Sequence, residues 1–323
     1  MAHRPLTIAC LEAVQAVATT GSMSAAAARL GRSQSAVSQL VSQAESSLGC
    51  TLFDRSSRPF RATQSGGELL RHAAGILHDL QALPQRMGGR GGGSLLRIAM
   101  VDSVANTLGA DLVRYAAGYG GDLYVSQGLT PAHVNDLLER RVDVIVASDT
   151  MDEHDGLSRF PILTERFVLL HPAARTPGRE GPVDLADLAG QLPFIRYTSR
   201  STTGAIIERY LRRLRVSDTR RIEVDNADMM CALVGNGVGW AITTPLHIMQ
   251  TLQRLEGVRV DTLRAPVPER SVTLITRAGE FEETASMLAA EARRLLQERY
   301  LPLLFDAVPA MAREIKVMNG FPR

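Results

Sequence analysis

The sequence predicts an α/β protein that carries a small, mostly helical module at its N-terminus. Residues 22–49 have the pattern of two short helices joined by a tight turn, and from Leu95 onward the chain alternates apolar strand-like and helix-like segments. Repeated strand–helix units form sheets whose faces are covered by helices. About 230 residues are too many for one such sheet, which favours two lobes.

The helical pair is defined by its caps. We expect the first helix to begin at Ser24 and to end at Gly31, because serine accepts hydrogen bonds from free N–H groups and glycine tolerates the left-handed backbone that ends helices. Ser33 can then cap the second helix. At about 100° per residue, the apolar residues of this helix fall within one arc of roughly 140°, opposite its serines and glutamine. The apolar set is Ala36, Val37, Leu40, Val41, Ala44 and Leu48, and the polar set is Ser35, Ser38, Gln39 and Ser42.

The second helix has the properties of a helix that enters the DNA major groove. Its small serine and glutamine side chains can donate and accept hydrogen bonds, so they can match the edges of bases. The four alanines at 25–28 allow the first helix to brace it closely. Residues 51–62 then form a short, turn-rich segment with three arginines, typical of a β-wing that lies on phosphates. A helical hairpin with a solvated polar face is the alternative interpretation.

Six short motifs lie along this segment: Gly-Ser at 21–22, Ala-Ala-Ala-Arg-Leu-Gly at 26–31, Ser-Gln-Ser-Ala-Val-Ser at 33–38, Leu-Gly at 48–49, Leu-Phe-Asp-Arg at 52–55 and Thr-Gln-Ser-Gly at 63–66. With these motifs the segment resembles the winged helix-turn-helix of LysR-type transcriptional regulators. Ala44 is smaller, and Gln39 less basic, than the residues usual at those positions. The resemblance implies pseudo-palindromic sites in double-stranded promoter DNA. It places Ser33, Gln34, Ser35, Ser38 and Gln39 nearest the bases, and Arg55, Arg58 and Arg61 on the phosphates.

One long helix is predicted from a cap at Thr63 to about Met87. Its apolar residues are spaced 4, 3, 4 and 3 apart, which is a heptad seam, at Leu69, Ala73, Ile76, Leu80 and Leu83. The seam can pack on its own domain or on a second chain, and the resemblance implies a dimerisation helix. Residues 88–94 are rich in glycine and predict a flexible hinge. We therefore divide the N-terminal part into a DNA-binding domain, 1–63, and a linker with its hinge, 64–94.

Composition and charge fit this organisation. Residues 1–90 contain nine arginines and five acidic residues, whereas the remainder has 27 basic and 29 acidic residues, so the excess positive charge lies at the expected DNA end. We find no apolar run long enough to span a bilayer and no signal peptide, and we expect a cytoplasmic protein. Three scattered cysteines, Cys10, Cys50 and Cys231, favour a reducing compartment. Each is interpreted as a small buried apolar residue, and a redox-sensing role for Cys231 is the alternative.

From Leu95 the pattern predicts mostly parallel sheets. The expected strands are 95–101, 122–126, 142–147, 166–170, 193–197, 220–224, 238–243 and 271–276. The expected helices are 104–118, 131–140, 202–213, 227–235 and 283–299. Three further segments, 141–146, 165–170 and 232–242, resemble the effector-binding domain of the same family. That resemblance implies two Rossmann-like lobes, similar to periplasmic binding proteins.

The resemblance also sets the expected boundaries of this domain. The effector-binding domain covers 95–299, with lobe I at about 95–163 and 270–299 and lobe II at about 164–269. The chain is expected to cross between the lobes near 161–168 and 266–271. We cannot match the tail, 300–323, to the family; it fits an amphipathic helix that covers a lobe, or an oligomer contact.

No catalytic constellation, metal cluster or cofactor motif emerges from the sequence. Hydroxyl and amide side chains instead follow several expected strands, where open α/β sheets bind ligands and helix N-termini attract anions. Converging in one cleft, these would bind a small carboxylate without a metal. By position within the resembled family, the expected effector-binding residues are Ser103, Thr130, Tyr197, Ser201, Thr202, Asn226 and Thr243.

The predicted function is that of a LysR-type, sequence-specific transcriptional regulator controlled by a small-molecule effector. A change in lobe closure would alter the angle between DNA-binding dimers in a tetramer. The implied partners are promoter DNA, the effector and further copies of the chain as a homodimer or homotetramer, with RNA polymerase as a further candidate and no membrane. A small-molecule-binding protein without a DNA-linked function is the alternative. An enzyme is the third class, and the absence of a nucleophile–base pair disfavours it.

Overall fold

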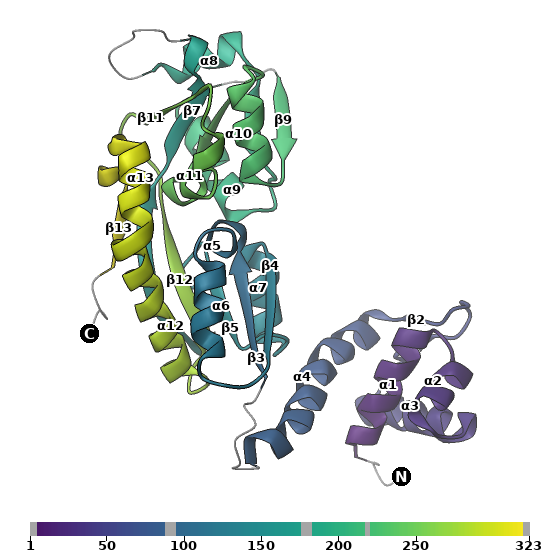
Figure 1. Ribbon diagram of the computed structural model, residues 1–323. Coiled ribbons are helices and arrows are strands. Elements are labelled where there is room, and N and C mark those ends of the chain that lie inside the picture. Colours follow the sequence, from purple (N-terminus) through teal and green to yellow (C-terminus); the bar gives the residue numbers. More distant parts are fainter. Residues whose placement is uncertain (1–4, 88–94, 176–182, 217–219, 319–323) are drawn as a thin grey trace. The chain divides into compact units, whose positions relative to one another are not determined.

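The computed structural model describes residues 5–87, 95–175, 183–216 and 220–318 (Figure 1). The chain forms two compact units, one N-terminal to Leu95 and one that holds most of the remaining residues. Each unit is described by itself. The glycine-rich hinge predicted at 88–94 lies outside the described residues.

The N-terminal unit is a three-helix core with a small hairpin and a long helix. Its elements are α1 (Ile8–Thr20), α2 (Met23–Leu30), α3 (Gln34–Leu48), β1 (Phe53–Asp54), β2 (Arg61–Ala62) and α4 (Gln64–Met87). Gly31 ends α2 in the left-handed region and Ser33 caps α3, as predicted. The predicted cap at Ser24 is wrong. Gly21 ends α1 and leaves Ser22 extended, so the Ala25 N–H donates to Ser22 Oγ and α2 begins two residues earlier.

Helix α3 buries a narrower face than predicted. Val37, Val41 and Ala44 are fully buried against α1 and α2, whereas Leu40 is only partly buried. Leu48 is 43% exposed, which contradicts its predicted place in the core. It is the last residue before Gly49, where the helix ends and the chain turns away.

The arginine-rich segment forms the predicted two-stranded wing. Phe53 pairs with Ala62 in antiparallel register. The wing loop is fixed to the helical core because the Phe60 N–H donates to the Gly21 carbonyl at 2.9 Å. Gly21 has φ 67°, and a Cβ there would overlap Pro59, so this approach of the wing requires glycine.

Helix α4 starts after Thr63, whose Oγ1 accepts from the Gly66 N–H at 3.0 Å. Part of its apolar seam packs within its own unit, because Ala73 and Leu77 form a buried cluster with Leu11. Ile76 and Leu80 face away and are 51% and 40% exposed. The side chain of Leu83 lies outside the described residues.

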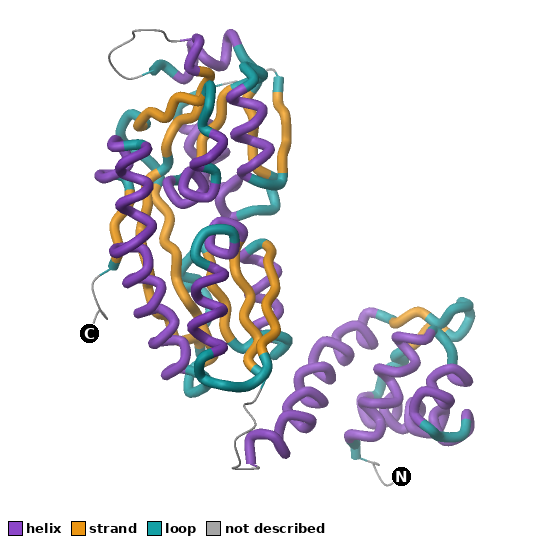
Figure 2. Tube along the Cα trace, in the orientation of Figure 1, coloured by secondary structure: helices purple, strands orange, loops and turns teal. Residues whose placement is uncertain are grey.

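The second unit contains two mixed sheets covered by helices, which confirms the two-lobed α/β prediction (Figures 1 and 2). The first sheet has the order β13–β6–β12–β5–β3–β4 and the second β11–β7–β10–β8–β9. The first sheet comprises β3 (Leu96–Val101), β4 (Leu123–Gly128), β5 (Val144–Ala147), β6 (Leu157–Arg166), β12 (Glu269–Arg277) and β13 (Ile315–Val317). The second comprises β7 (Val168–Pro172), β8 (Phe194–Tyr197), β9 (Arg221–Val224), β10 (Trp240–Thr243) and β11 (Val258–Thr262).

The expectation of mostly parallel sheets is only partly right. Strand β3 is parallel to β4 and β5, and β8 is parallel to β9 and β10, but β6, β7, β11, β12 and β13 pair antiparallel. The chain passes from the first sheet to the second at Phe167, between β6 and β7. It returns between Thr262 and Glu269. Figure 1 shows β12 running along the length of the first lobe toward the second.

Helices surround both sheets, and the predicted helices 202–213 and 227–235 match α9 (Thr202–Arg213) and α10 (Ala227–Gly235). The others are α5 (Asp102–Ala105), α6 (Gly109–Ala117), α7 (Thr130–Leu138), α8 (Leu185–Gln191), α11 (Pro245–Gln250) and α12 (Glu282–Leu295). The helix predicted at 104–118 is therefore divided. The Thr107 hydroxyl donates to the Ser103 carbonyl at 2.6 Å, and the chain turns there before α6 begins.

The C-terminal tail is a helix followed by a strand. The amphipathic helix prediction holds only for α13 (Leu301–Ala307), which buries Leu301 and Leu304. Beyond it, β13 adds an antiparallel edge strand to β6, with Ile315 opposite Glu165. Ile315 and Val317 are buried in the core of this unit.

Ending the chain at Arg313 would remove β13 and the side chains of Ile315 and Val317. Loss of this burial should lower the free energy of unfolding by about 2–4 kcal/mol and the melting temperature by roughly 5–10 °C. Thermal unfolding of the full chain and of two truncations measures the effect. A truncation after Met318 keeps β13 and is the control. Equal melting of both truncations would show that β13 does not stabilise the domain.

Candidate functional site

The outer face of α3 presents short polar side chains. Ser33, Gln34, Ser35 and Gln39 are exposed and Ser38 is half-buried. Caps and local bonds orient several of them: the Ala36 N–H donates to Ser33 Oγ at 3.2 Å, and Ser24 Oγ donates to Gln34 Oε1 at 3.1 Å. The Gln34 amide nitrogen has no partner among the residues that the structure describes. This face therefore offers both donors and acceptors.

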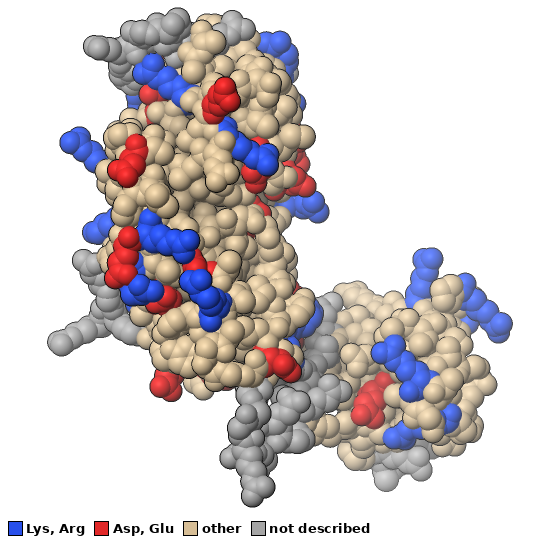
Figure 3. Space-filling view, in the orientation of Figure 1, with Lys and Arg blue, Asp and Glu red and all other residues tan. Residues whose placement is uncertain are grey.

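The wing arginines differ from one another. Arg58 and Arg61 are exposed and form no ion pair within the described part of the chain. Arg55 instead pairs with Glu45 of α3 at 2.7 Å, and Glu45 also accepts from the Leu52 N–H at 2.9 Å. Arg55 thus fastens the wing to α3. Figure 3 shows more basic than acidic side chains on the visible face of the N-terminal unit.

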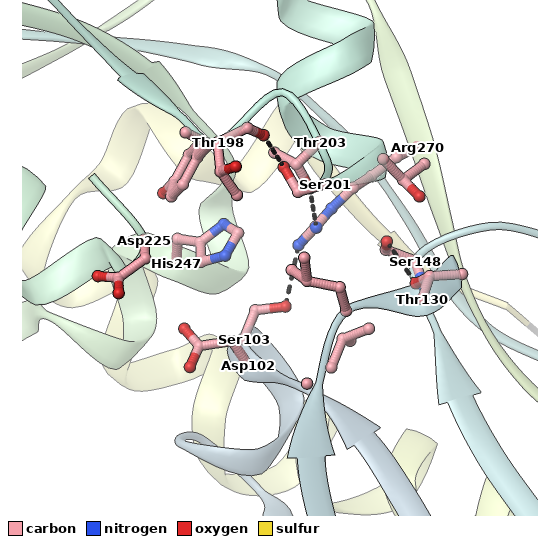
Figure 4. A pocket seen from close by; sticks show the side chains of 15 residues that line it. Asp102, Ser103, Thr130, Ser148, Thr198, Ser201, Thr203, Asp225, His247 and Arg270 are labelled. Atoms are coloured by element: carbon pink, nitrogen blue, oxygen red, sulfur yellow. Dashed lines mark hydrogen bonds between the residues drawn. The ribbon is translucent and has the colours of Figure 1, made fainter. Parts of the chain in front are cut away.

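A second candidate site is a cavity of about 40 Å³ between the two lobes of the second unit (Figure 4). It is lined by the ends of strands β3, β4, β5 and β8 and by the starts of helices α5, α7 and α9. The predicted residues found in its lining are Ser103, Thr130, Tyr197, Ser201 and Thr202. Lining residues that the sequence did not single out for the site are Asp102, Ser148, Thr198, Thr203, Asp225, His247 and Arg270.

Two predicted residues are absent from the described lining of this cavity. Asn226 caps α10, where its Oδ1 accepts from the Met229 N–H at 2.8 Å. The Thr243 hydroxyl is hydrogen bonded to the Tyr197 hydroxyl at 2.7 Å and is fully buried. Thr243 therefore supports a lining residue rather than facing the cavity.

The guanidinium of Arg270, a residue that is 4% exposed, lies in the wall of the cavity. Arg270 and Glu165 are directly paired across β12 and β6, and their ion pair measures 2.7 Å. The guanidinium also donates to three hydroxyls at 2.9–3.1 Å, those of Ser103, Thr203 and Thr244. Figure 4 shows its bonds to Ser103 below and Thr203 above. The second Glu165 oxygen accepts from the Leu246 N–H at 2.8 Å.

Two of the predicted hydroxyls serve local structure as well as the lining. Ser201 caps α9: its Oγ accepts from the Gly204 N–H and donates to the Thr198 carbonyl, both at 2.9 Å. Thr130 begins α7, and its Oγ1 accepts from the Ser148 N–H at 3.0 Å. Each hydroxyl thus satisfies a backbone group at a strand–helix junction.

His247 and Tyr197 form an aromatic wall of the cavity, with ring centroids 5.1 Å apart. Burial and the nearby Arg270 charge hold the pKa of His247 well below its usual value, so the imidazole is neutral near pH 7. Burial likewise raises the pKa of the Tyr197 hydroxyl, which stays protonated. The aromatic wall therefore carries no charge.

A wider recess of about 770 Å³ adjoins the cavity and shares Asp102, Gly128, Leu129, Thr198 and Asp225 with it. Its remaining lining comes from Gln127, Arg200, Glu223, Val224 and Met229. Burial raises the pKa of Asp102, although hydrogen bonds from Gln127 and Asn106 partly offset this. The recess is thus lined by three carboxylates and one guanidinium.

Other candidate chemistry receives little support. Cys231 is buried beside Thr251, and burial raises the pKa of its thiol, which disfavours the reactive thiolate that redox sensing needs. Among the described residues, no group of three or more His, Cys, Asp or Glu side chains could hold a metal ion. None of the described helices is long and apolar enough to cross a membrane.

The sequence could not identify Arg270, because its partner Glu165 lies 105 residues away and is adjacent only in the folded sheet. One signal was present: Arg270 lies near the start of a strand whose centre contains Val272, Leu274 and Ile275. An ionisable residue in such a strand requires a buried partner. His247 gave no comparable signal.

These features define a class of protein in which a helix-turn-helix unit with a wing accompanies a two-lobed ligand-binding domain. Comparison with known families agrees. Residues 8–67 match the bacterial regulatory helix-turn-helix protein, lysR family, and residues 89–299 match the LysR substrate binding domain. The chain belongs to the LysR family of DNA-binding transcriptional regulators, which confirms the prediction from sequence.

Individual relatives support this assignment. The transcriptional regulator ShiR of Corynebacterium glutamicum is 32% identical over 248 residues, which cover 72% of this chain and 81% of ShiR. The regulatory protein NocR of Agrobacterium fabrum is 28% identical over 73% of this chain and 79% of NocR. The structure of full-length OxyR from Pseudomonas aeruginosa has a TM-score of 0.64, with 20% identity, and covers 90% of this chain and 96% of OxyR. The family is one of regulators rather than of enzymes.

Replacing Glu165 with glutamine would leave the Arg270 guanidinium buried without a counter-charge. Removing one partner of a buried ion pair costs about 3–5 kcal/mol, so the E165Q variant should unfold at distinctly lower denaturant concentration. Chemical denaturation of the full chain measures this. E269Q is the matched control, because the one ion pair of Glu269 within the described ranges is an exposed pair with Arg166. If E165Q is as stable as E269Q, the pair does not stabilise the fold.

Proposed function

We propose that a small molecule bound in the cavity between the two lobes controls how this regulator acts at promoter DNA. The single observation that supports this best is the position of Arg270, which bonds to Ser103 at the start of α5 and to Thr203 of α9. These hydroxyls come from elements of different lobes. A ligand among them would change the relative free energies of lobe arrangements, which is the requirement for a regulatory response.

The proposed effector-binding residues are Ser103, Thr130, Tyr197, Ser201 and Thr202, with Thr203, His247 and Arg270 added from the geometry. A carboxylate fits this set, because hydroxyl donors and the N-terminus of the 12-residue helix α9 stabilise negative charge. We no longer include Asn226 and Thr243, because both side chains are engaged in structural bonds.

For the DNA-binding surface we propose Ser33, Gln34, Ser35, Ser38 and Gln39 as the residues nearest the bases. Arg58 and Arg61 are proposed to contact phosphates directly, whereas Arg55 positions the wing through Glu45. The exposed Ile76 and Leu80 of α4 support pairing of this helix with a second chain. A homodimer would read two half-sites, and a homotetramer two such pairs. We also propose action in the cytoplasm, where the regulator can meet RNA polymerase at the promoter.

The Gln34→Ala variant tests the proposed reading of bases. Loss of a side-chain amide at a base edge should reduce discrimination between operator and random DNA by about 1–3 kcal/mol. Gel-shift titrations with the upstream promoter region and with scrambled DNA measure this ratio. Ser46→Ala alters an exposed polar residue elsewhere on α3 and is the control. Unchanged discrimination would remove Gln34 from the reading set, and no operator preference in the parent protein would contradict the proposed function.

The Arg61→Ala variant tests the proposed phosphate contact. It should weaken binding to operator and random DNA alike and reduce the slope of log affinity against log salt by about one unit, because one fewer counterion is released. Arg209→Ala removes an exposed arginine from α9 and should leave the slope unchanged. A slope for the Arg61 variant equal to that of the parent protein would exclude the contact.

A further inference from the structure

Two hydroxyls in the wall of the cavity between the lobes, those of Ser103 and Thr203, have their donor direction set by Arg270. Arginine has no acceptor, so each hydroxyl that meets its guanidinium must accept there. The hydroxyl protons of Ser103 and Thr203 must then point elsewhere, and the described residues offer them no acceptor. Both side chains are more than nine-tenths buried and line the cavity. They are donors available to a ligand in the cavity.

His247 supplies a third donor through the same network. Thr244 is fully buried and accepts from Arg270, and the one acceptor for its own proton among the described residues is His247 Nδ1 at 3.1 Å. Since the imidazole is neutral, its proton is then on Nε2. His247 is 6% exposed and lines the cavity, and its Nε2 has no partner among the described residues. A ligand acceptor at this point would give Nε2 a hydrogen-bond partner.

The inner cavity is therefore suited to an anionic acceptor group of small size. About 40 Å³ accommodates roughly one to three small groups of the size of a water molecule. That volume matches a carboxylate. The positive charge of Arg270 is offset by Glu165, so neutral donors rather than a free cation bind this group.

The adjoining recess favours a cationic group, whereas the cavity favours an anionic one. Asp102 and Asp225 line both the cavity and the recess, and no basic side chain pairs with either one in the described chain. Figure 4 shows both on the same side of the cavity as His247, opposite Thr130 and Ser148. Glu223 lines the recess but not the cavity, and it forms an ion pair with Arg196 at 3.6 Å. Arg200 is the one basic residue in the described lining of the recess.

The anion-binding and cation-binding positions lie next to each other, because Asp102 directly precedes the donor Ser103 in the chain. A ligand that fills both places carries an anionic acceptor group and a cationic group close to each other. We propose that the effector of this regulator is an α-amino acid, with its carboxylate at Ser103, Thr203 and His247 and its ammonium group at Asp102 and Asp225. The amino-acid side chain then extends into the recess. This inference rests on the proposed effector site.

Binding to the purified full-length protein tests the inference. The probes are the twenty standard L-amino acids, each compared with the 2-oxo acid that lacks only the ammonium group. At least one amino acid should raise the melting temperature, and calorimetry should show that its 2-oxo acid binds at least about tenfold more weakly. If no amino acid binds, or if the 2-oxo acid binds equally well, the inference is wrong.

Variants separate this inference from the proposed function. Asp102→Asn keeps the shape of the side chain and should weaken binding of the amino acid by about tenfold or more while leaving the affinity of the 2-oxo acid unchanged. Asp306→Asn, at an exposed position of α13, is the matched control and should bind like the parent protein. An equal loss for both probes would show that Asp102 acts only through the structure. Binding of simple carboxylic acids without any amino acid would uphold the effector site and overturn its proposed ligand class.

Discussion

The buried pair of Arg270 and Glu165 determines much of the arrangement of the second unit. Removing both charges from water has a large desolvation cost, which is offset only when every donor and acceptor finds a partner. Here the Arg270 guanidinium donates to Glu165 and to three hydroxyls, and the Glu165 carboxylate accepts from Arg270 and from the Leu246 N–H. The pair therefore fixes side chains from both lobes. It also offsets the charge of Arg270, so the donors around the guanidinium are neutral hydroxyls.

In the N-terminal unit, too, an ion pair with an additional backbone hydrogen bond fixes one element against another. Glu45 of α3 accepts from the Leu52 N–H and from Arg55, which sets the wing against the helix. Gly21 accepts the Phe60 N–H at the other end of the wing. Exposed arginines on this hairpin are thereby held at a defined distance from the polar face of α3. A DNA-binding surface needs this rigidity, because phosphate contacts fix the register in which a helix meets the bases.

Helices with a hydroxyl or amide cap and a consistent apolar period could be predicted from sequence, as α9 after Ser201 and α10 after Asn226 illustrate. The chain carries alternative caps, and Ser22 rather than Ser24 begins α2 because the left-handed Gly21 precedes it. Strand β6 was missed because Pro161 interrupts its apolar run and its burial does not alternate. The edge strand β13 has only three residues and depends on pairing with β6.

The residues of the candidate site likewise fall into those that could be predicted from the sequence and those that could not. Hydroxyls at strand–helix junctions could be located because the topology of α/β sheets gathers the ends of their strands, and five of the seven expected residues line the cavity. Arg270, Glu165 and His247 are brought there by long-range pairing, which one sequence does not encode locally. Asn226 and Thr243 show that a polar residue at a junction can be used entirely by its own backbone or by a neighbour.

The same buried pair limits how a ligand can regulate this protein. Arg270 bonds to Ser103 on one side and to Thr203 and Thr244 on the other, so a rotation of the lobes that separates these hydroxyls breaks at least one bond to a charged donor. Such bonds contribute about 1.5–3 kcal/mol each. A ligand shifts the equilibrium only by the difference in its affinity for the two arrangements. An effector that adds bonds to Ser103, Thr203 and His247 on both sides of the guanidinium supplies a difference of this size, whereas one that touches a single lobe does not.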